Sequence, residues 1–117
     1  MRKVIIIMCS LVLVACADGG KATSVVGDFL KANLATTEYS TELLAMDSTK
    51  ALADSIIMMM RNEAASDKYF KKNIQWGQHK GGKLVYARVR ILQLNDTLVR
   101  TFYLDPDKKS VVAFKMN

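Results

Sequence analysis

The stretch KLVYARVRILQL at residues 83–94 decides the fold, together with TLVRTFYL at residues 97–104. In both stretches apolar and polar residues largely alternate, and β-branched and aromatic side chains are frequent. A period of two is typical of a strand that buries one of its faces. Asn95-Asp96 between the two stretches is a hairpin signal, because both residues tolerate the backbone of a tight turn. The two stretches therefore predict an antiparallel hairpin with one buried face.

Two further strands are expected, one on each side of this hairpin. Residues 72–79 precede it across Gly81-Gly82, and residues 110–116 follow it across Asp105-Pro106-Asp107. Paired glycines tolerate the positive φ of a tight turn, and proline presets φ in a turn. The C-terminal half of the chain thus predicts a four-stranded antiparallel meander.

Two-residue loops at the first two turns set a register in which Val89 faces Phe102 and Trp76 faces Ala87. One face then collects apolar side chains, which are Ile74, Trp76, Val85, Ala87, Val89, Ile91, Leu98, Phe102 and Leu104. A slip by one residue would mix the two faces, so this segregation supports the register. Continuing it turns Val112, Phe114 and Met116 inward, and Arg100 and Gln78 are the polar residues expected there. This last step needs an odd-numbered loop, whose three-residue form favours glycine at the position of Lys108.

The opposite face of the sheet is polar and aromatic. It collects Asn73, Gln75, Tyr86, Arg88, Arg90, Thr101 and Tyr103. Arginine and tyrosine are enriched at binding hot spots, and Tyr86, Arg88 and Arg90 share one strand with Tyr103 across the ladder. These four residues are the candidate contact surface. An ordinary solvated outer face of an antiparallel sheet is the alternative.

Helical periodicity precedes the strands. A helix over about 23–35 has an apolar stripe, and Gly27 inside it suggests a close approach to another backbone. A weaker pattern predicts a second helix at 37–45, and Asp47 or Ser48 is the expected cap of a third helix at 49–65. The stripe of the first helix is Val25, Val26, Phe29, Leu30 and Leu34, and that of the third is Leu52, Ile56, Met59 and Met60, with Ile57 to one side. Tyr69 and Phe70 in the following connection are expected on the core.

The order of helices first and strands second predicts an α+β fold. The N-terminal helices would pack on one face of the four-stranded antiparallel meander. Residues 22–117 are long enough for one domain and too short for two, so we expect a single α+β domain.

The N-terminus carries a different signal. Arg2 and Lys3 precede an apolar run over 4–14, which is shorter than the roughly 20 residues of a spanning helix and typical of a signal-peptide core. The run ends in Leu13-Val14-Ala15-Cys16, which resembles the bacterial lipobox. The resemblance implies cleavage of residues 1–15 and acylation of Cys16, with 16–21 as a short irregular tether containing Gly19-Gly20. An ordinary secretory signal is the alternative. Because each buried methylene contributes about 0.8 kcal/mol, two or more acyl chains would anchor the protein stably in a membrane.

Charge and cysteine content narrow the function classes. Removing residues 1–15 leaves 102 of 117 residues and takes Arg2 and Lys3 away, so the net charge of +6 falls to +4. Cys9 leaves with the signal and Cys16 is acylated, which leaves no thiol for a disulfide, a metal or a nucleophile. A modest positive charge suits solubility or anionic lipid and glycan surfaces. The sequence has no dense run of basic residues, so nucleic acid is not expected as a partner.

Few residues suggest chemistry. The single histidine, His79, is expected in a solvated loop beside the glycine turn, without the orienting partner that a general base needs. Gly81-Gly82-Lys83 leads into a strand rather than a helix, so it is not a phosphate loop. The acidic residues are scattered, and Met58-Met59-Met60 cannot converge on one metal because successive helical residues point about 100° apart. We therefore expect no metal, no cofactor and no catalytic residue.

The order of elements, with VVGDFLKANL at 25–34 and the strands from KLVYARVRIL onward, is similar to the cystatin-like and nuclear-transport-factor-2-like α+β folds. With the LVAC box, the chain also resembles small lipoproteins of Gram-negative bacteria. The resemblance implies a lipid-anchored location in the cell envelope, at the outer membrane, with either leaflet open. The expected role is a non-catalytic binding module for a protein, a glycan or a second copy. The alternatives are a small hydrolase-like or isomerase-like enzyme with a cavity between helix and sheet, and a structural accessory subunit of an envelope complex.

Overall fold

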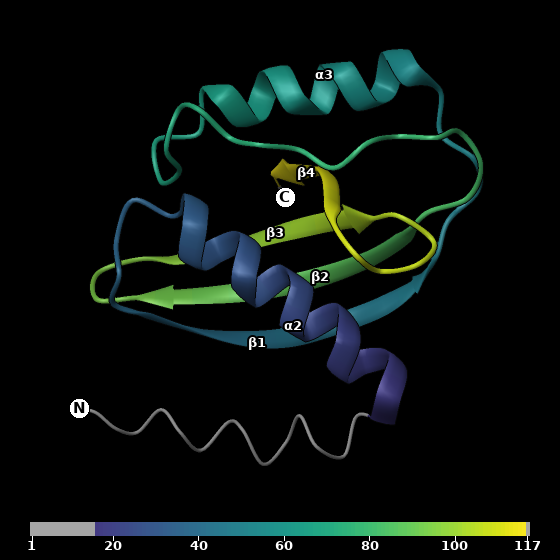
Figure 1. The fold of residues 1–117 in the computed structure, drawn as a ribbon. Coiled ribbons are helices and arrows are strands. Elements are labelled where there is room, and N and C mark those ends of the chain that lie inside the picture. The colour runs from purple at the N-terminus through teal and green to yellow at the C-terminus, as the bar shows by residue number, and fades with distance from the viewer. Residues whose placement is uncertain (1–15, 117) are drawn as a thin grey trace.

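The computed structural model describes the backbone of residues 16–116 and the side chains of residues 21–116. It shows two helices packed against a four-stranded antiparallel sheet, in the strand order β1-β2-β3-β4 (Figure 1). The α+β fold with a four-stranded antiparallel meander is therefore confirmed. In chain order the elements are α2 (Cys16–Asn33), β1 (Tyr39–Ser48), α3 (Asp54–Ala65), β2 (Val85–Gln93), β3 (Thr97–Leu104) and β4 (Val111–Met116).

The first strand of the sheet is not the one expected from the sequence. Residues 39–48 form β1 and pair with β2, so the helix predicted at 37–45 is wrong. The pairing shifts between Leu43 and Ala45, which makes Leu44 the extra residue of a β-bulge. A bulge places two successive residues against one on the partner strand, so it interrupts the period of two. The adjacent leucines then look like part of a helical stripe.

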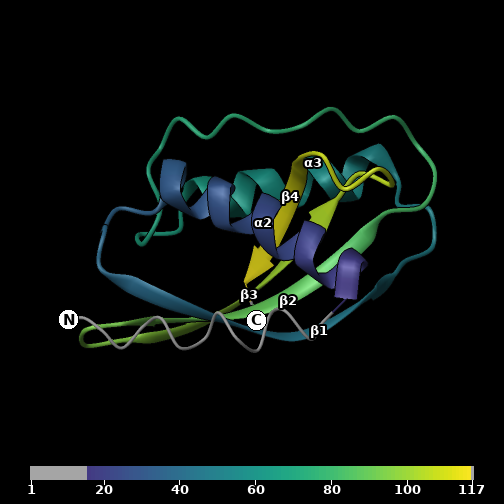
Figure 2. The same ribbon diagram turned by 60° about the horizontal axis from the view of Figure 1, so that its bottom comes forward.

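The strand predicted at 72–79 is also wrong, because β1 already occupies the free side of β2. This segment crosses the molecule as an irregular connection between α3 and β2 (Figure 2). The Gly77 N–H donates to the Val111 carbonyl at 2.8 Å, and the Arg61 guanidinium donates to the carbonyls of Gly77 and Val112 at 2.9 Å each. The connection is therefore held to β4 by backbone and side-chain hydrogen bonds rather than by a strand ladder.

The hairpin between β2 and β3 keeps the predicted faces but not the predicted register. Gln93 N–H donates to the Asp96 carbonyl at 2.8 Å, so the two-residue turn is Leu94-Asn95 instead of Asn95-Asp96. Every pairing then shifts by two residues, and Ala87 rather than Val89 lies opposite Phe102. Because side chains alternate with a period of two, a shift by two leaves each residue on its predicted face.

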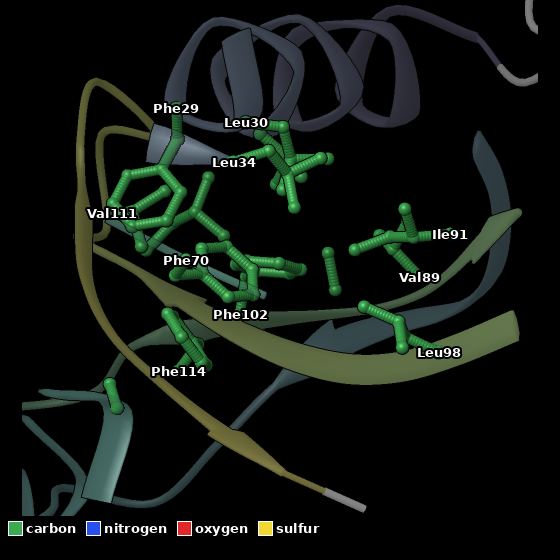
Figure 3. Packing of buried hydrophobic residues seen from close by; sticks show 14 of the residues in the cluster. Phe29, Leu30, Leu34, Phe70, Val89, Ile91, Leu98, Phe102, Val111 and Phe114 are labelled. Atoms are coloured by element: carbon green, nitrogen blue, oxygen red, sulfur yellow. The ribbon is translucent and has the colours of Figure 1, made fainter. Parts of the chain in front are cut away.

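The core between α2 and the sheet is aromatic. Phe29 and Leu30 of α2, Phe102 of β3 and Phe114 of β4 are all buried, and the rings of Phe70 and Phe114 lie 4.5 Å apart (Figure 3). Burying one such side chain contributes about 1.5–3 kcal/mol. The inward positions predicted from the sequence are confirmed for Ala87, Val89, Ile91, Leu98, Phe102 and Leu104, which are buried, and for Ile74 and Trp76, which pack against the cluster.

Strand β4 lies between the two helices. Val111 and Phe114 belong to the cluster under α2, whereas Val112 and Ala113 belong to a second cluster with Ile57 and Met60 of α3. All four residues of Val111–Phe114 are buried, as in a strand covered on both sides. The predicted burial of Val112 and Phe114 is confirmed, although Val112 joins the α3 cluster.

The loop before β4 departs from the predicted form. It spans 105–110, and a register shift near Leu104 gives it the parity that the inward Phe114 requires. Lys108 has a φ of 57°. The backbone there is in the left-handed region that favours glycine, although the residue is a lysine. Met116, predicted inward, is 40 % exposed.

Helix α3 is shorter than predicted and turned differently. Asp47 and Ser48 belong to β1, so the helix begins at Asp54 after Ala53. Its buried residues are Ile57, Met60 and Ala64, while Ile56 and Met59 of the predicted stripe are 39 % and 50 % exposed. Of the predicted stripe, Met60 is therefore confirmed, as is Ile57 beside it, and Leu52 packs against the same cluster from just before the helix; the inward positions of Ile56 and Met59 are wrong.

Helix α2 extends the predicted 23–35 helix toward the N-terminus, and its stripe is confirmed by the burial of Val26, Phe29, Leu30 and Leu34. Residues 17–21, expected as an irregular tether, are helical. A Cβ built at Gly27 meets nothing within 4 Å, so the close approach suggested there is wrong. Among Gly27, Gly77, Gly81 and Gly82, it is Gly77 that has a close approach, because a Cβ there would clash with the Ser110 side chain.

Candidate functional site

The candidate contact surface lies on the sheet face opposite the aromatic core. Register brings its members together, because Tyr86 pairs with Tyr103 and Arg88 pairs with Thr101. They differ in accessibility. Arg88 is exposed, Tyr86 is half-buried against the α3 cluster, and Tyr103 is only 9 % exposed. Tyr103 is therefore part of the packing under α3 rather than of a free surface.

Arg90 already has a partner within the fold. Its Nη1 donates to Oε1 of Glu42 at 2.6 Å, across the β1–β2 ladder in which the two residues are paired. Both side chains remain open to solvent, at 41 % for Arg90 and 49 % for Glu42. Such an exposed ion pair contributes about 0–1 kcal/mol. The ion pair with Glu42 fixes the direction in which the Arg90 side chain points on the outer face.

Two leucines complete the accessible part of this face. Leu92 continues the row of Arg88 and Arg90 along β2 and is 40 % exposed, and Leu44 at the β1 bulge is 37 % exposed. The accessible outer face therefore combines Arg88, the Arg90–Glu42 pair, Leu44 and Leu92. We call this set the outer-face surface. Of these residue types, arginine is the one that is enriched at the hot spots of protein contacts.

His79 is not the solvated loop residue that the sequence suggests. Its side chain is only 6 % exposed, and its Nδ1 lies 2.8 Å from Oδ1 of Asp54, the first residue of α3. Its Nε2 is buried and has no hydrogen-bond partner among the described residues. The orienting carboxylate that the sequence analysis found missing is thus present. The fold supplies it from a helix 25 residues earlier in the chain, which no local pattern indicates.

A second charged pair lies inside the core. Nε of Arg100 donates to Oδ2 of Asp67 at 2.8 Å, with side-chain exposures of 9 % and 2 %. Oδ1 of Asp67 accepts the Tyr69 N–H at 3.1 Å, and the guanidinium carbon of Arg100 lies 5.9 Å from the centre of the Tyr69 ring. The inward position of Arg100 was predicted, but Asp67 was not. The predicted burial of an arginine is itself the signal for it, since a buried cation requires a buried acceptor.

Neither the His79–Asp54 pair nor the Arg100–Asp67 pair forms a metal site. Among the side chains of residues 21–116, no three His, Cys, Asp or Glu converge in a way that would hold a metal ion. The Asp105 carboxylate forms hydrogen bonds within its own loop, where it accepts from the Lys109 N–H at 2.8 Å and from the Ser110 hydroxyl at 3.1 Å. Burial raises the pKa of the Tyr39 hydroxyl above its ordinary value of 10.0.

The N-terminal predictions fall largely outside the described residues. The signal peptide 1–15, with Leu13-Val14-Ala15, lies there, and Cys16 is the first residue of α2. No described helix is long and apolar enough to cross a membrane. The lipidation of Cys16 stays a prediction.

Compared with models of protein families, with curated proteins and with solved structures, the chain has no match.

Proposed function

We propose that the protein is a lipid-anchored, extracytoplasmic, non-catalytic interaction module of the bacterial cell envelope. The anchor is Cys16, and the expected location is the outer membrane of a Gram-negative bacterium, in either leaflet. The LVAC sequence at 13–16 after a short apolar run supports the anchor. The protein would then bind the membrane through the acyl chains on Cys16.

The observation that carries the interaction role is the outer-face surface. Arg88 is exposed, and in the described part of the chain it forms no ion pair, while Arg90 is aimed outward by Glu42. Both stand on the central strand β2, which is paired on both sides and therefore rigid. Because Glu42 already orients Arg90, this side chain loses less entropy on binding than a free arginine does. This arrangement favours a contact surface over a solvated face with no partner.

Two features argue against the enzyme alternative. The space between α2 and the sheet is occupied by the rings of Phe29, Phe102 and Phe114. His79 has a carboxylate partner, but its Nε2 is buried away from solvent, and a general base must reach its substrate. Histidine and a carboxylate, the residue types of a catalytic dyad, are therefore present, but a substrate has no access to the buried Nε2.

Two experiments test this function. Cys16→Ser in the full chain should move the protein from the membrane pellet to the soluble fraction, and retention in the pellet would refute the anchor. A photo-crosslinking amino acid at position 88 should give a discrete adduct in intact cells, whereas the same amino acid at position 107, on the exposed β3–β4 loop, should not. The adduct distinguishes a protein partner, a glycan and a second copy by mass. Equal crosslinking at both positions would argue against the outer-face surface.

A further inference from the structure

The two edges of the sheet are treated differently by the fold. The edge of β4 is covered, because the Val111 carbonyl accepts the Gly77 N–H and the Val112 carbonyl accepts Nε of Arg61. Strand β1 forms the other edge, and among the described residues only β2 pairs with it. No backbone hydrogen bond joins residues 39–48 to any described element other than β2. Figure 1 shows β1 as the outermost strand on this side of the sheet. Within residues 16–116, the outer edge of β1 therefore presents N–H and C=O groups that no other strand pairs with.

Half of this edge is regular. Tyr39–Leu43 pairs without interruption with Gln93–Val89, and the bulge at Leu44 begins only after it. A regular stretch of five residues is enough to receive an added strand, whose main-chain hydrogen bonds supply affinity and whose alternate side chains supply specificity. We call residues 39–43 the open edge.

The charges on and beside the open edge disfavour a second copy as its occupant. Residues 38–48 contain Glu38, Glu42 and Asp47 and no basic residue, in a chain with a net charge of +6. Antiparallel pairing of the open edge with its own copy about Thr41 would set Glu42 diagonal to its counterpart and to the other Glu38. Diagonal neighbours are within reach of long side chains, so these carboxylates would repel one another. The same charges favour a basic partner strand.

The two faces of the open edge define the pattern of that partner. Tyr39 and Leu43 lie on the core side, where both pack against the aromatic cluster. Glu42 lies on the outer side and is 49 % exposed; its Oε1 is bonded to Arg90, and its Oε2 is left to accept from a second cation. An added strand would therefore carry apolar residues toward the core side and lysine or arginine toward Glu42.

We infer that the open edge of β1 binds an extended basic segment of a partner protein, in which apolar residues alternate with lysine or arginine. The inference rests on the proposed function in that it takes the protein to be an interaction module. It places the backbone contact at β1, beside the outer-face surface on β2.

The test uses the full-length protein in detergent and a synthetic heptapeptide of alternating valine and lysine, acetylated and amidated. Affinity is measured by calorimetry, and backbone amide hydrogen exchange reports which residues become protected. Two matched peptides serve as controls: one has N-methyl groups on alternate amides, and the other has glutamate in place of lysine. N-methylation removes the ladder hydrogen bonds and keeps the charge.

The lysine peptide should bind and slow amide exchange within residues 39–43, and both control peptides should bind at least about tenfold more weakly, a loss of about 1.4 kcal/mol. Glu42→Lys should reverse the preference toward the glutamate peptide. Glu42→Gln, which keeps a hydrogen-bond acceptor for Arg90, should weaken lysine-peptide binding without reversal. As a control, Asp107→Lys makes the same charge change as Glu42→Lys, but on the exposed β3–β4 loop, and should leave binding unchanged.

Equal binding of the N-methylated peptide would reduce the effect to charge attraction and overturn the inference. So would the absence of binding, or amide protection outside β1. Concentration-dependent dimerisation that protects residues 39–43 would replace the basic segment by a second copy. None of these outcomes changes the fractionation of Cys16→Ser or the adduct at position 88, so failure here is separable from failure of the proposed function.

Discussion

Asp67 and Arg100 form a charged pair inside the core, with 2.8 Å between Oδ2 and Nε, although the aspartate lies just after α3 and the arginine stands on β3. The Asp67 carboxylate also accepts the Tyr69 N–H, so one side chain ties the end of α3 to the sheet and shapes the connection that follows. Removing one member of such a pair leaves the other charge buried and unpaired.

We therefore expect Asp67→Ala to destabilise the protein by about 3–5 kcal/mol in urea unfolding. The double variant Asp67→Ala with Arg100→Met removes both charges and should be clearly more stable than Asp67→Ala alone. If the double variant is instead as unstable as the sum of the two single changes, the pair does not act as a unit.

Gly77 and Gly27 make a matched pair of glycines with opposite surroundings. Gly77→Ala places a Cβ 2.0 Å from Oγ and 2.6 Å from Cβ of Ser110, so we expect a loss of about 1–3 kcal/mol. Gly27→Ala meets nothing within 4 Å inside α2 and should gain about 0.5–1 kcal/mol. Thermal unfolding measures both. A neutral Gly77→Ala would show that the connection is not held close to β4.

Substitutions at Arg88 and Arg61 compare a surface arginine with one that holds the fold together. Arg88→Ser should change the free energy of unfolding by no more than about 0.5 kcal/mol, because the side chain is exposed. Arg61→Ser removes donors from the carbonyls of Gly77 and Val112 and should cost about 1–3 kcal/mol. A large loss for Arg88→Ser would contradict the assignment of the outer face.

The raised pKa of Tyr39 makes stability depend on pH in the alkaline range. The folded protein holds the phenolic proton at pH values where the unfolded chain, at about 10, has released it, so the free energy of unfolding falls as pH rises above about 10. Tyr39→Phe should flatten this dependence in chemical unfolding measured between pH 9 and pH 11. An unchanged slope would mean that other groups cause the alkaline loss.

Much of the sheet could be predicted because its signals are local. Val89, Phe102 and Phe114 were placed on the inward face from alternation alone, and a register error of two residues did not disturb this placement. The apolar stripe of α2 followed from its period in the same way. Of the residues named for the candidate contact surface, Arg88 and Arg90 are accessible as alternation predicts, but Tyr103 is covered by the α3 cluster.

The sequence by itself determined the α+β class, the inward faces of β2 and β3 and the lipobox-like LVAC at 13–16, because each of these is written in neighbouring residues. Only the tertiary structure decided that residues 39–48, rather than 72–79, complete the sheet, since both segments compete for the same side of β2. It also decided that Asp67 meets Arg100 and that Asp54 meets His79. These pairs join residues 25 and 33 positions apart, and such contacts depend on how the elements pack rather than on any local pattern.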